Sequence, residues 1–169
     1  MLPQIKKLTL IFIAVLLSVN SMHAQKTAEE AKTYFSSYKS TNTIMELIST
    51  SLPTLEECKF VFKEEFAQTY LDYANDMKGQ LANSGNIKNE DFVDIGIETF
   101  TIQDLKDFKG NYAGGMTSVL PKLNDGLTFF KVEQLRTVGA ERGISYNYWV
   151  YIRERWVFFP KPWRAFKEN

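Results

Sequence analysis

Apolar side chains recur every three or four positions over the first half of the chain, a spacing that gathers them on one side of a helix. A capping box of Thr27 and Glu30 predicts where the first helix begins. Its apolar side would be formed by Ala31, Tyr34, Phe35 and Tyr38. A short second helix is expected over 44–50. Behind a second capping box, the same spacing continues and predicts one long helix over 54–78.

After residue 90 the pattern changes to apolar and β-branched runs bounded by turn residues, which are typical of strands. We expect strands over residues 92–100, 127–138, 144–152 and 155–159. The five residues between the second and third strands have the length of a hairpin loop. Two short helical turns are expected between the first two strands, on either side of the glycine-rich loop 110–115. That loop lacks both the GxGxxG spacing and the Gly-Lys-Ser/Thr ending of phosphate-binding loops, so we interpret it as a turn.

Helices followed by strands in this order are typical of the α+β class. We therefore expect one α+β domain over residues 25–169. Its N-terminal helices would pack on one face of a C-terminal antiparallel sheet of three or four strands. A chain of this length is sufficient to bury a single core.

Two segments carry a family resemblance. The opening TAEEAKTYFSSYKSTNTIMELI and the closing hairpin WVYIRERWVFF resemble the two ends of the nuclear-transport-factor-like, ketosteroid-isomerase-like cone fold. That resemblance implies a cone-like arrangement whose sheet and helices enclose a pocket, with a Tyr or Asp in its lining. LPTLEECKFVF and RWVFFPKPWR resemble uncharacterised small exported proteins of Bacteroidota-type bacteria, which implies a source and no activity.

The N-terminus has the order of segments found in a secretory signal peptide. Lys6 and Lys7 precede an apolar run over 8–19, and small and polar residues follow up to Ala24. We predict a cleavable signal over residues 1–24, cut after Ala24. The apolar run would span only ~18 Å as a helix, too little for a ~30 Å hydrocarbon core. The mature chain is therefore expected to be periplasmic or secreted, without an integral membrane segment.

The rest of the composition excludes several chemistries. The only histidine, His23, lies in the predicted signal, and the only cysteine is Cys58. Ser-His-Asp or Cys-His catalysis, histidine-ligated metals and an intramolecular disulfide are therefore not expected, and no cofactor is implied. Loss of Lys6 and Lys7 leaves two more acidic than basic residues, a balance that does not favour nucleic acid. Cys58 lies on the apolar side of its helix, so we interpret it as a buried free thiol, with an intermolecular disulfide as the alternative.

The C-terminal segment is the richest in aromatic residues, with all three tryptophans after residue 144. Alternation along the strand 144–152 assigns Tyr146, Tyr148 and Val150 to the core face. The opposite face and the proline-stiffened tail then supply a candidate binding surface, formed by Trp149, Tyr151, Arg153, Trp163 and Arg164. Tryptophan and arginine predominate in binding hot spots. The alternative is a tail folded back over its own sheet.

The leading hypothesis is an exported, non-catalytic binding module that uses this aromatic and arginine face for a small ligand or an envelope protein. One alternative is an enzyme or a carrier of a lipophilic ligand, with a cone-fold cavity. Another is a structural subunit of an envelope assembly that forms a homodimer across its sheet. An exposed Trp149 and Trp163 surface would favour the binding module, and an enclosed pocket with a polar group would favour the enzyme or carrier.

Overall fold

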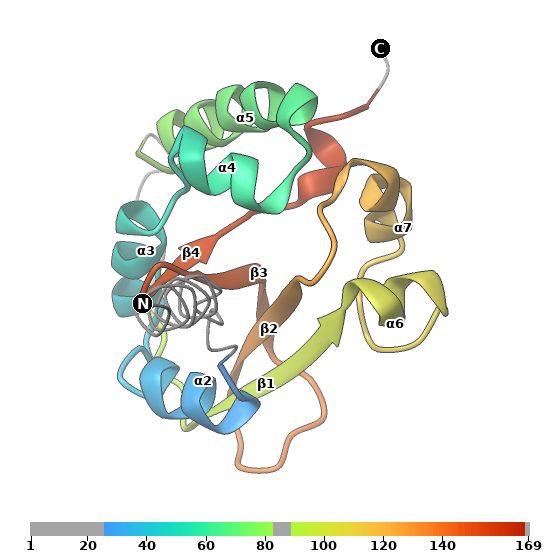
Figure 1. Ribbon diagram of the computed structural model, residues 1–169. Helices are drawn as coiled ribbons and strands as arrows, with labels where there is room; N and C mark the ends of the chain where they lie inside the picture. Colours follow the sequence, from blue (N-terminus) through green and yellow to red (C-terminus); the bar gives the residue numbers. More distant parts are fainter. Residues whose placement is uncertain (1–25, 83–88, 168–169) are drawn as a thin grey trace, which may run out of the picture.

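The computed structural model describes residues 26–82 and 89–167, which are built around a four-stranded antiparallel sheet (Figure 1). The strands lie side by side in chain order, β1-β2-β3-β4. They span Asp94–Thr101, Thr128–Leu135, Ile144–Ile152 and Arg155–Phe158. The predicted α+β class and all four predicted strands are confirmed. The predicted signal, residues 1–24, lies outside the described residues.

Within the part of the chain that the structure describes, four helices precede the sheet, and two short ones follow β1. Their bounds are Ala28–Phe35 for α2, Thr41–Thr50 for α3, Leu55–Val61 for α4, Glu64–Ala82 for α5, Ile102–Lys106 for α6 and Gly115–Val119 for α7. Two 3-10 turns, η1 and η2, span Leu120–Lys122 and Pro162–Arg164. The predicted capping boxes are present, because Thr27 and Thr54 each exchange hydrogen bonds with the glutamate three residues later. No helix within the described residues is both long and apolar enough to cross a membrane.

The sheet separates two apolar cores, because successive side chains of a strand point to opposite faces. Phe129 belongs to one core and its neighbour Phe130 to the other. Residues of α2 and α3, among them Phe35 and Ile48, complete the core of Phe130. Residues of α4, α5, α6 and α7 complete the core of Phe129. The helices therefore cover both faces of the sheet, rather than one face as predicted, because both faces carry large apolar side chains.

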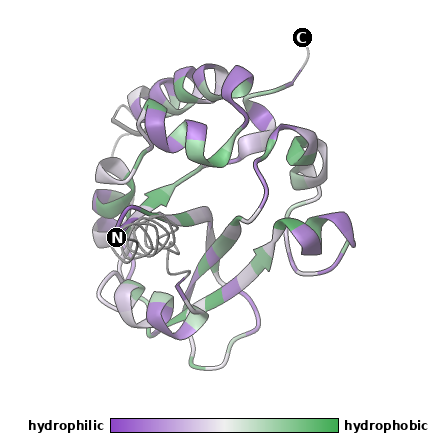
Figure 2. Cartoon of the chain, in the orientation of Figure 1, coloured by the Kyte–Doolittle hydropathy of each residue, from purple (hydrophilic) through white to green (hydrophobic). Residues whose placement is uncertain are grey.

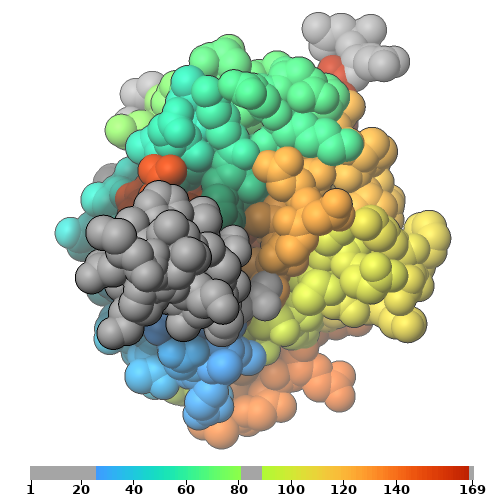
Figure 3. Space-filling model, viewed as in Figure 1, coloured from blue at the N-terminus to red at the C-terminus, as the bar shows by residue number. Residues whose placement is uncertain are grey.

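The predicted continuous helix over 54–78 is wrong, because the structure divides it into α4 and α5 at Phe62. That residue has extended backbone angles and pairs with Leu123 in an isolated antiparallel bridge. The side-chain amide of Asn124 donates hydrogen bonds to the carbonyls of Lys59, Phe60 and Phe62, at 2.9, 3.1 and 2.9 Å. These bonds satisfy carbonyl groups that the end of α4 leaves without helical partners. Figure 3 shows the resulting contact between the segments of α4–α5, in green, and residues near 120, in orange.

The C-terminal tail completes the core of Phe129. The hydroxyl of Tyr70, which is fully buried on α5, donates a 3.1 Å hydrogen bond to the carbonyl of Pro160. The indole of Trp163 lies so close to Gly115 that a Cβ atom there would collide with it. Figure 2 shows hydrophilic residues along the outer side of α5 and apolar residues on α7 and the strands. The predicted alternative is a tail folded back over its own sheet, and the position of Trp163 agrees with it, because its ring packs next to Tyr148 of β3.

Candidate functional site

The five residues predicted for the binding surface do not form one surface. Trp149 is fully buried in the core of Phe130, where its ring centroid lies 4.9 Å from that of Phe35 and 4.8 Å from that of Phe158. The expectation of an exposed Trp149 is therefore wrong. The physical reason is that α2 and α3 cover the face of the sheet that was expected to be open.

The other four predicted residues are divided between the two sides of the sheet. Trp163 is half-buried and packs with the core of Phe129, next to Tyr148 at 6.3 Å between ring centroids. Arg164 is exposed in the same tail segment. Arg153 is exposed in the turn between β3 and β4, with a positive φ of 47°. Of the five, Tyr151 alone borders the cleft on the α2 and α3 side of the sheet.

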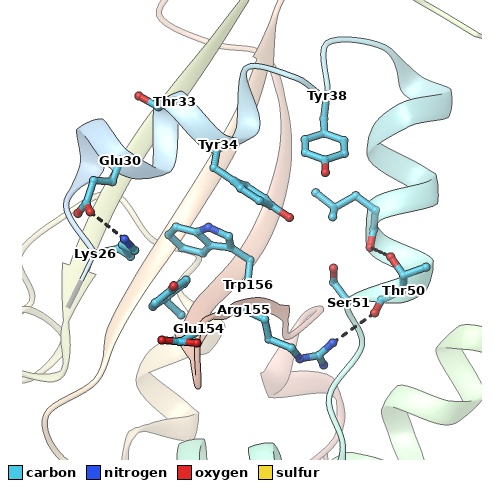
Figure 4. A pocket seen from close by; sticks show the side chains of 12 residues that line it. Lys26, Glu30, Thr33, Tyr34, Tyr38, Thr50, Ser51, Glu154, Arg155 and Trp156 are labelled. Atoms are coloured by element: carbon cyan, nitrogen blue, oxygen red, sulfur yellow. Dashed lines mark hydrogen bonds and ion pairs between the residues drawn. The ribbon is translucent and has the colours of Figure 1, made fainter. Parts of the chain in front are cut away.

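That cleft lies between α2, α3 and the β3–β4 hairpin and has a volume of about 770 Å³ (Figure 4). This volume is within the range typical of small-molecule sites, about 300–1,000 Å³. The side chains in its wall are aromatic, hydroxyl-bearing or charged, with one leucine. They are Lys26, Glu30, Thr33, Tyr34, Tyr38, Leu47, Thr50, Ser51, Tyr151, Glu154, Arg155 and Trp156.

Four aromatic rings form a row along the cleft, which we call the aromatic row: Tyr38, Tyr34, Trp156 and Tyr151. Successive ring centroids are 5.6, 6.0 and 5.2 Å apart. Tyr34 lies in the last turn of α2, Tyr38 follows three residues after the end of that helix, and the other two rings are held by the hairpin. Tyr34 is 39% exposed, whereas Trp156 is 5% exposed and forms the floor.

The charged groups of the cleft are mostly paired within the protein. The ammonium of Lys26 lies 2.8 Å from the carboxylate of Glu30 and 5.1 Å from the centre of the Tyr151 ring. The Lys26 ammonium and the backbone N–H of Thr27 lower the pKa of Glu30 to about 2. Glu30 therefore stays ionised at neutral pH and cannot act as a general acid there.

At the other end of the cleft, Arg155 forms a two-point ion pair with Glu57 of α4, at 2.6 and 2.9 Å. The same guanidinium donates to the carbonyls of Thr50 and Leu52. Among the described residues of the cleft, Glu154 is the one charged side chain that forms no ion pair, and it lies at the exposed hairpin turn. The cleft thus presents little unpaired charge.

The hydroxyl of Tyr34 is directed into the cleft, toward Tyr38 and Ser51 (Figure 4). Burial and a hydrogen bond with Tyr38 raise the pKa of Tyr34 to about 12. The phenol is therefore neutral at physiological pH and can both donate and accept a hydrogen bond. It adds a neutral polar group within the aromatic row.

Sequence reasoning missed most of this cleft. The sequence pattern places Tyr34 and Tyr38 on the core side of the first helix. The helical spacing of apolar residues does not distinguish a residue in the core from a residue that lines a half-covered cleft. Two tyrosines four residues apart are the available signal, since their hydroxyls favour partly exposed positions. The approach of α3 to the hairpin depends on tertiary packing, which no local pattern reports.

A smaller cavity of about 240 Å³ lies near the start of β3, between α3, α5 and the tail. Apolar side chains predominate in its wall, among them Met45, Ile48, Met77 and Trp163. Trp163 therefore borders a cavity, separate from the one that Tyr151 borders.

Within residues 26–82 and 89–167, no three His, Cys, Asp or Glu side chains are grouped so that they could hold a metal ion. No known protein family, curated protein or solved structure matches the chain. The resemblance to the cone fold therefore stays a prediction, and the function must be argued from the cleft itself.

Proposed function

We propose that the protein is an exported, non-catalytic binding module, and that the cleft between α2, α3 and the β3–β4 hairpin takes a small, uncharged organic ligand. The observation that carries the proposal is the aromatic row on the wall of a cleft of about 770 Å³. Concave sites with aromatic walls and a few polar groups are the usual form of small-molecule sites.

The polarity of the cleft supports an uncharged ligand. Lys26 is paired with Glu30, and Arg155 is paired with Glu57, so both cations already have carboxylate partners. A charged ligand would have to compete with these ion pairs. An anionic ligand would also meet the carboxylate of Glu154, which has no ion-pair partner. The hydroxyl groups of Tyr34 and Ser51 can bind a neutral polar group without that competition.

The arrangement supports binding more than catalysis. A general acid–base mechanism needs two titratable groups whose pKa values are matched to their roles. The pKa of Glu30 is held low, that of Tyr34 is held high, and Arg155 is occupied by Glu57. Neither Glu30 nor Tyr34 is poised to exchange a proton near neutral pH.

The test is a screen of uncharged small molecules against the purified protein, followed by the Tyr34→Ala variant. We expect ligands that change tryptophan fluorescence, since Trp156 forms the floor, and a loss of about 2 kcal/mol in binding in the variant, as for a hot-spot residue. The matched control is Val138→Ala, because Val138 is 80% exposed and lies outside the cleft. Ligands that bind Tyr34→Ala as tightly as the parent would contradict the proposal.

The apolar cavity of about 240 Å³ favours a second candidate function, carriage of a lipophilic ligand. A cavity of about 150 Å³ can hold a benzene ring, so this one accepts a slightly larger apolar molecule. Met45→Lys would place a charge in its wall. A lipophilic ligand lost from Met45→Lys but retained by Tyr34→Ala would support the carrier and contradict the binding cleft.

A further inference from the structure

We infer that the ligand of the cleft is a neutral oligosaccharide of two or three sugar units that lies along the aromatic row. The inference rests on the proposed function and specifies its ligand class. Its grounds are the spacing of the aromatic rings, the free acceptor groups along the margin and the pairing of the cleft's charges.

The first ground is the geometry of the row. Its rings follow one another at centroid distances of 5.6, 6.0 and 5.2 Å, comparable with the repeat of a chain of sugar rings. Aromatic faces are electron-rich and attract positively polarised hydrogens, such as the axial C–H groups of a pyranose. Tyr34 is one of the two inner rings of the row and is 39% exposed, so a sugar can reach its ring from solvent.

Successive rings are also rotated relative to one another. The interplanar angle is 40° between Tyr38 and Tyr34, 35° between Tyr34 and Trp156, and 63° between Trp156 and Tyr151. A single flat ligand, such as a fused aromatic system, cannot lie against all four rings. A chain of short rigid units joined by rotatable bonds can follow this twist, which favours an oligosaccharide over a planar molecule.

The second ground is the set of hydrogen-bond acceptors along the margin. The hydroxyl of Thr33 donates to the carbonyl of Glu29, and the hydroxyl of Thr50 donates to carbonyls of its own helix. Each hydroxyl has one proton and two lone pairs, so both threonines retain acceptor capacity toward the cleft. Glu154 adds a carboxylate acceptor at the exposed turn. Sugar hydroxyls supply the donors that such acceptors require.

The third ground is charge. Lys26 occupies the face of Tyr151 and is bound to Glu30, so a cationic ligand would have to displace it. An anionic sugar would meet Glu154 and find Arg155 already bound to Glu57. A neutral sugar carries no charge to compete with these ion pairs, and it can lie against Tyr34 and Tyr38 while Lys26 keeps its place over the face of Tyr151.

The experiment is isothermal titration calorimetry of the purified protein with named neutral saccharides. The probes are glucose, maltotriose, cellotriose, xylotriose and N,N′,N″-triacetylchitotriose, with tri-galacturonic acid as the anionic comparison. We expect at least one neutral trisaccharide to bind at least tenfold more tightly than its monosaccharide, since longer chains contact more of the row. We also expect tri-galacturonic acid to bind at least tenfold more weakly than that trisaccharide.

Two variants at one position separate stacking from hydroxyl contacts. Tyr34→Ala should weaken trisaccharide binding at least tenfold, whereas Tyr34→Phe keeps the ring and should weaken it no more than about threefold. Val138→Ala should bind as the parent does. Circular dichroism of each variant shows that the fold is intact.

The possible failures are distinct. If uncharged molecules of another class bind in a Tyr34-dependent way and none of the neutral trisaccharides does, the oligosaccharide is overturned and the binding cleft stands. If a trisaccharide binds Tyr34→Ala as tightly as the parent, the aromatic row is not its site, and the inference is overturned. If no uncharged molecule binds the protein, both the inference and the proposed function are overturned.

Discussion

Glu57 and Arg155 are 98 residues apart in the chain and form a two-point ion pair, with Nε to Oε1 at 2.6 Å and Nη2 to Oε2 at 2.9 Å. Glu57 also accepts from the backbone N–H and the hydroxyl of Thr54, which completes the capping box of α4. One carboxylate thus fixes the start of α4 and joins it to the β3–β4 hairpin. The side chain of Glu57 is 7% exposed and that of Arg155 is 40% exposed, so the carboxylate is buried whereas its partner is partly open to solvent.

The first prediction concerns the stability that this pair provides. Burial raises the pKa of Glu57, but the hydrogen bonds from Arg155 and Thr54 outweigh it, so the pKa lies below its usual value. A lowered pKa stabilises the fold above the unfolded-state value of about 4.3, and this stability is lost as pH falls through the folded-state value. Glu57→Gln should therefore cost about 1–3 kcal/mol at pH 7 and less at pH 3. Urea unfolding at both pH values measures the difference.

Arg153→Met is the matched control for Arg155→Met, because both arginines lie at the same hairpin and Arg153 is exposed. Arg155→Met should reproduce the loss seen in Glu57→Gln, and Arg153→Met should leave the unfolding midpoint nearly unchanged. Equal effects of the two arginine variants would show that hairpin composition, rather than the ion pair, sets the stability.

The second prediction concerns the break between α4 and α5. The side-chain amide of Asn124 donates hydrogen bonds to three carbonyls around Phe62, so Asn124→Ala leaves those carbonyls without these hydrogen bonds. We expect a loss of about 1–3 kcal/mol in the free energy of unfolding. Asn42→Ala is the control, since Asn42 is exposed on α3. An Asn124→Ala variant as stable as the control would contradict a structural role for the amide.

The sequence could predict the helix caps and the strands, because both depend on residues close together in the chain. It could not predict the end of α4 at Phe62. There the apolar spacing continues without interruption, and the cause of the break is Asn124, some sixty residues later. A helix that ends through a distant side chain carries no local signal.

The same limit applies to the candidate site. Alternation along β3 correctly assigned Trp149 and Tyr148 to opposite faces. It could not show that α2 and α3 bury Trp149 while the cleft remains open at Tyr151. The positions of helices that are distant in the sequence determine which part of an apolar face is buried and which part lines a cleft. Those positions therefore determine whether a residue belongs to the core or to the candidate site.

The third prediction concerns Cys58. Burial, with a smaller effect of Glu57, raises the pKa of the thiol to about 12, and the residue is fully buried. The thiolate is the reactive form, so labelling by a disulfide reagent at pH 8 should be slow in native protein and fast in urea. Native protein should also run as a monomer on a non-reducing denaturing gel. Fast labelling of the native thiol, or a disulfide-linked dimer on the gel, would contradict its burial.

The fourth prediction concerns export. If residues 1–24 are a cleavable signal, mature protein recovered from the host envelope or medium should begin at Gln25. Mass spectrometry of the intact protein measures this directly. Replacing Leu16 and Leu17 by aspartate breaks the apolar run and should retain the unprocessed chain in the cytoplasm. Full-length protein in the envelope fraction would show that the segment is not cleaved.

The last prediction compares two tryptophans on opposite sides of the sheet. Trp149 is 0% exposed, so Trp149→Ala should cost about 3–5 kcal/mol, as large-to-small changes in a core do. Trp163 is half-buried against Gly115, so Trp163→Ala should cost less, about 1–3 kcal/mol. Chemical denaturation of both variants measures the order.

Arg164→Ala provides the comparison within the tail, because Arg164 is exposed and should be nearly neutral for folding. Binding gives an independent measurement. Trp163 and Arg164 lie outside the cleft that Tyr151 borders, so their variants should keep the affinity of the parent for any ligand of that cleft. If Trp163→Ala or Arg164→Ala lowered this affinity at least tenfold without a change in stability, the tail rather than the α2–α3 cleft would be the binding surface.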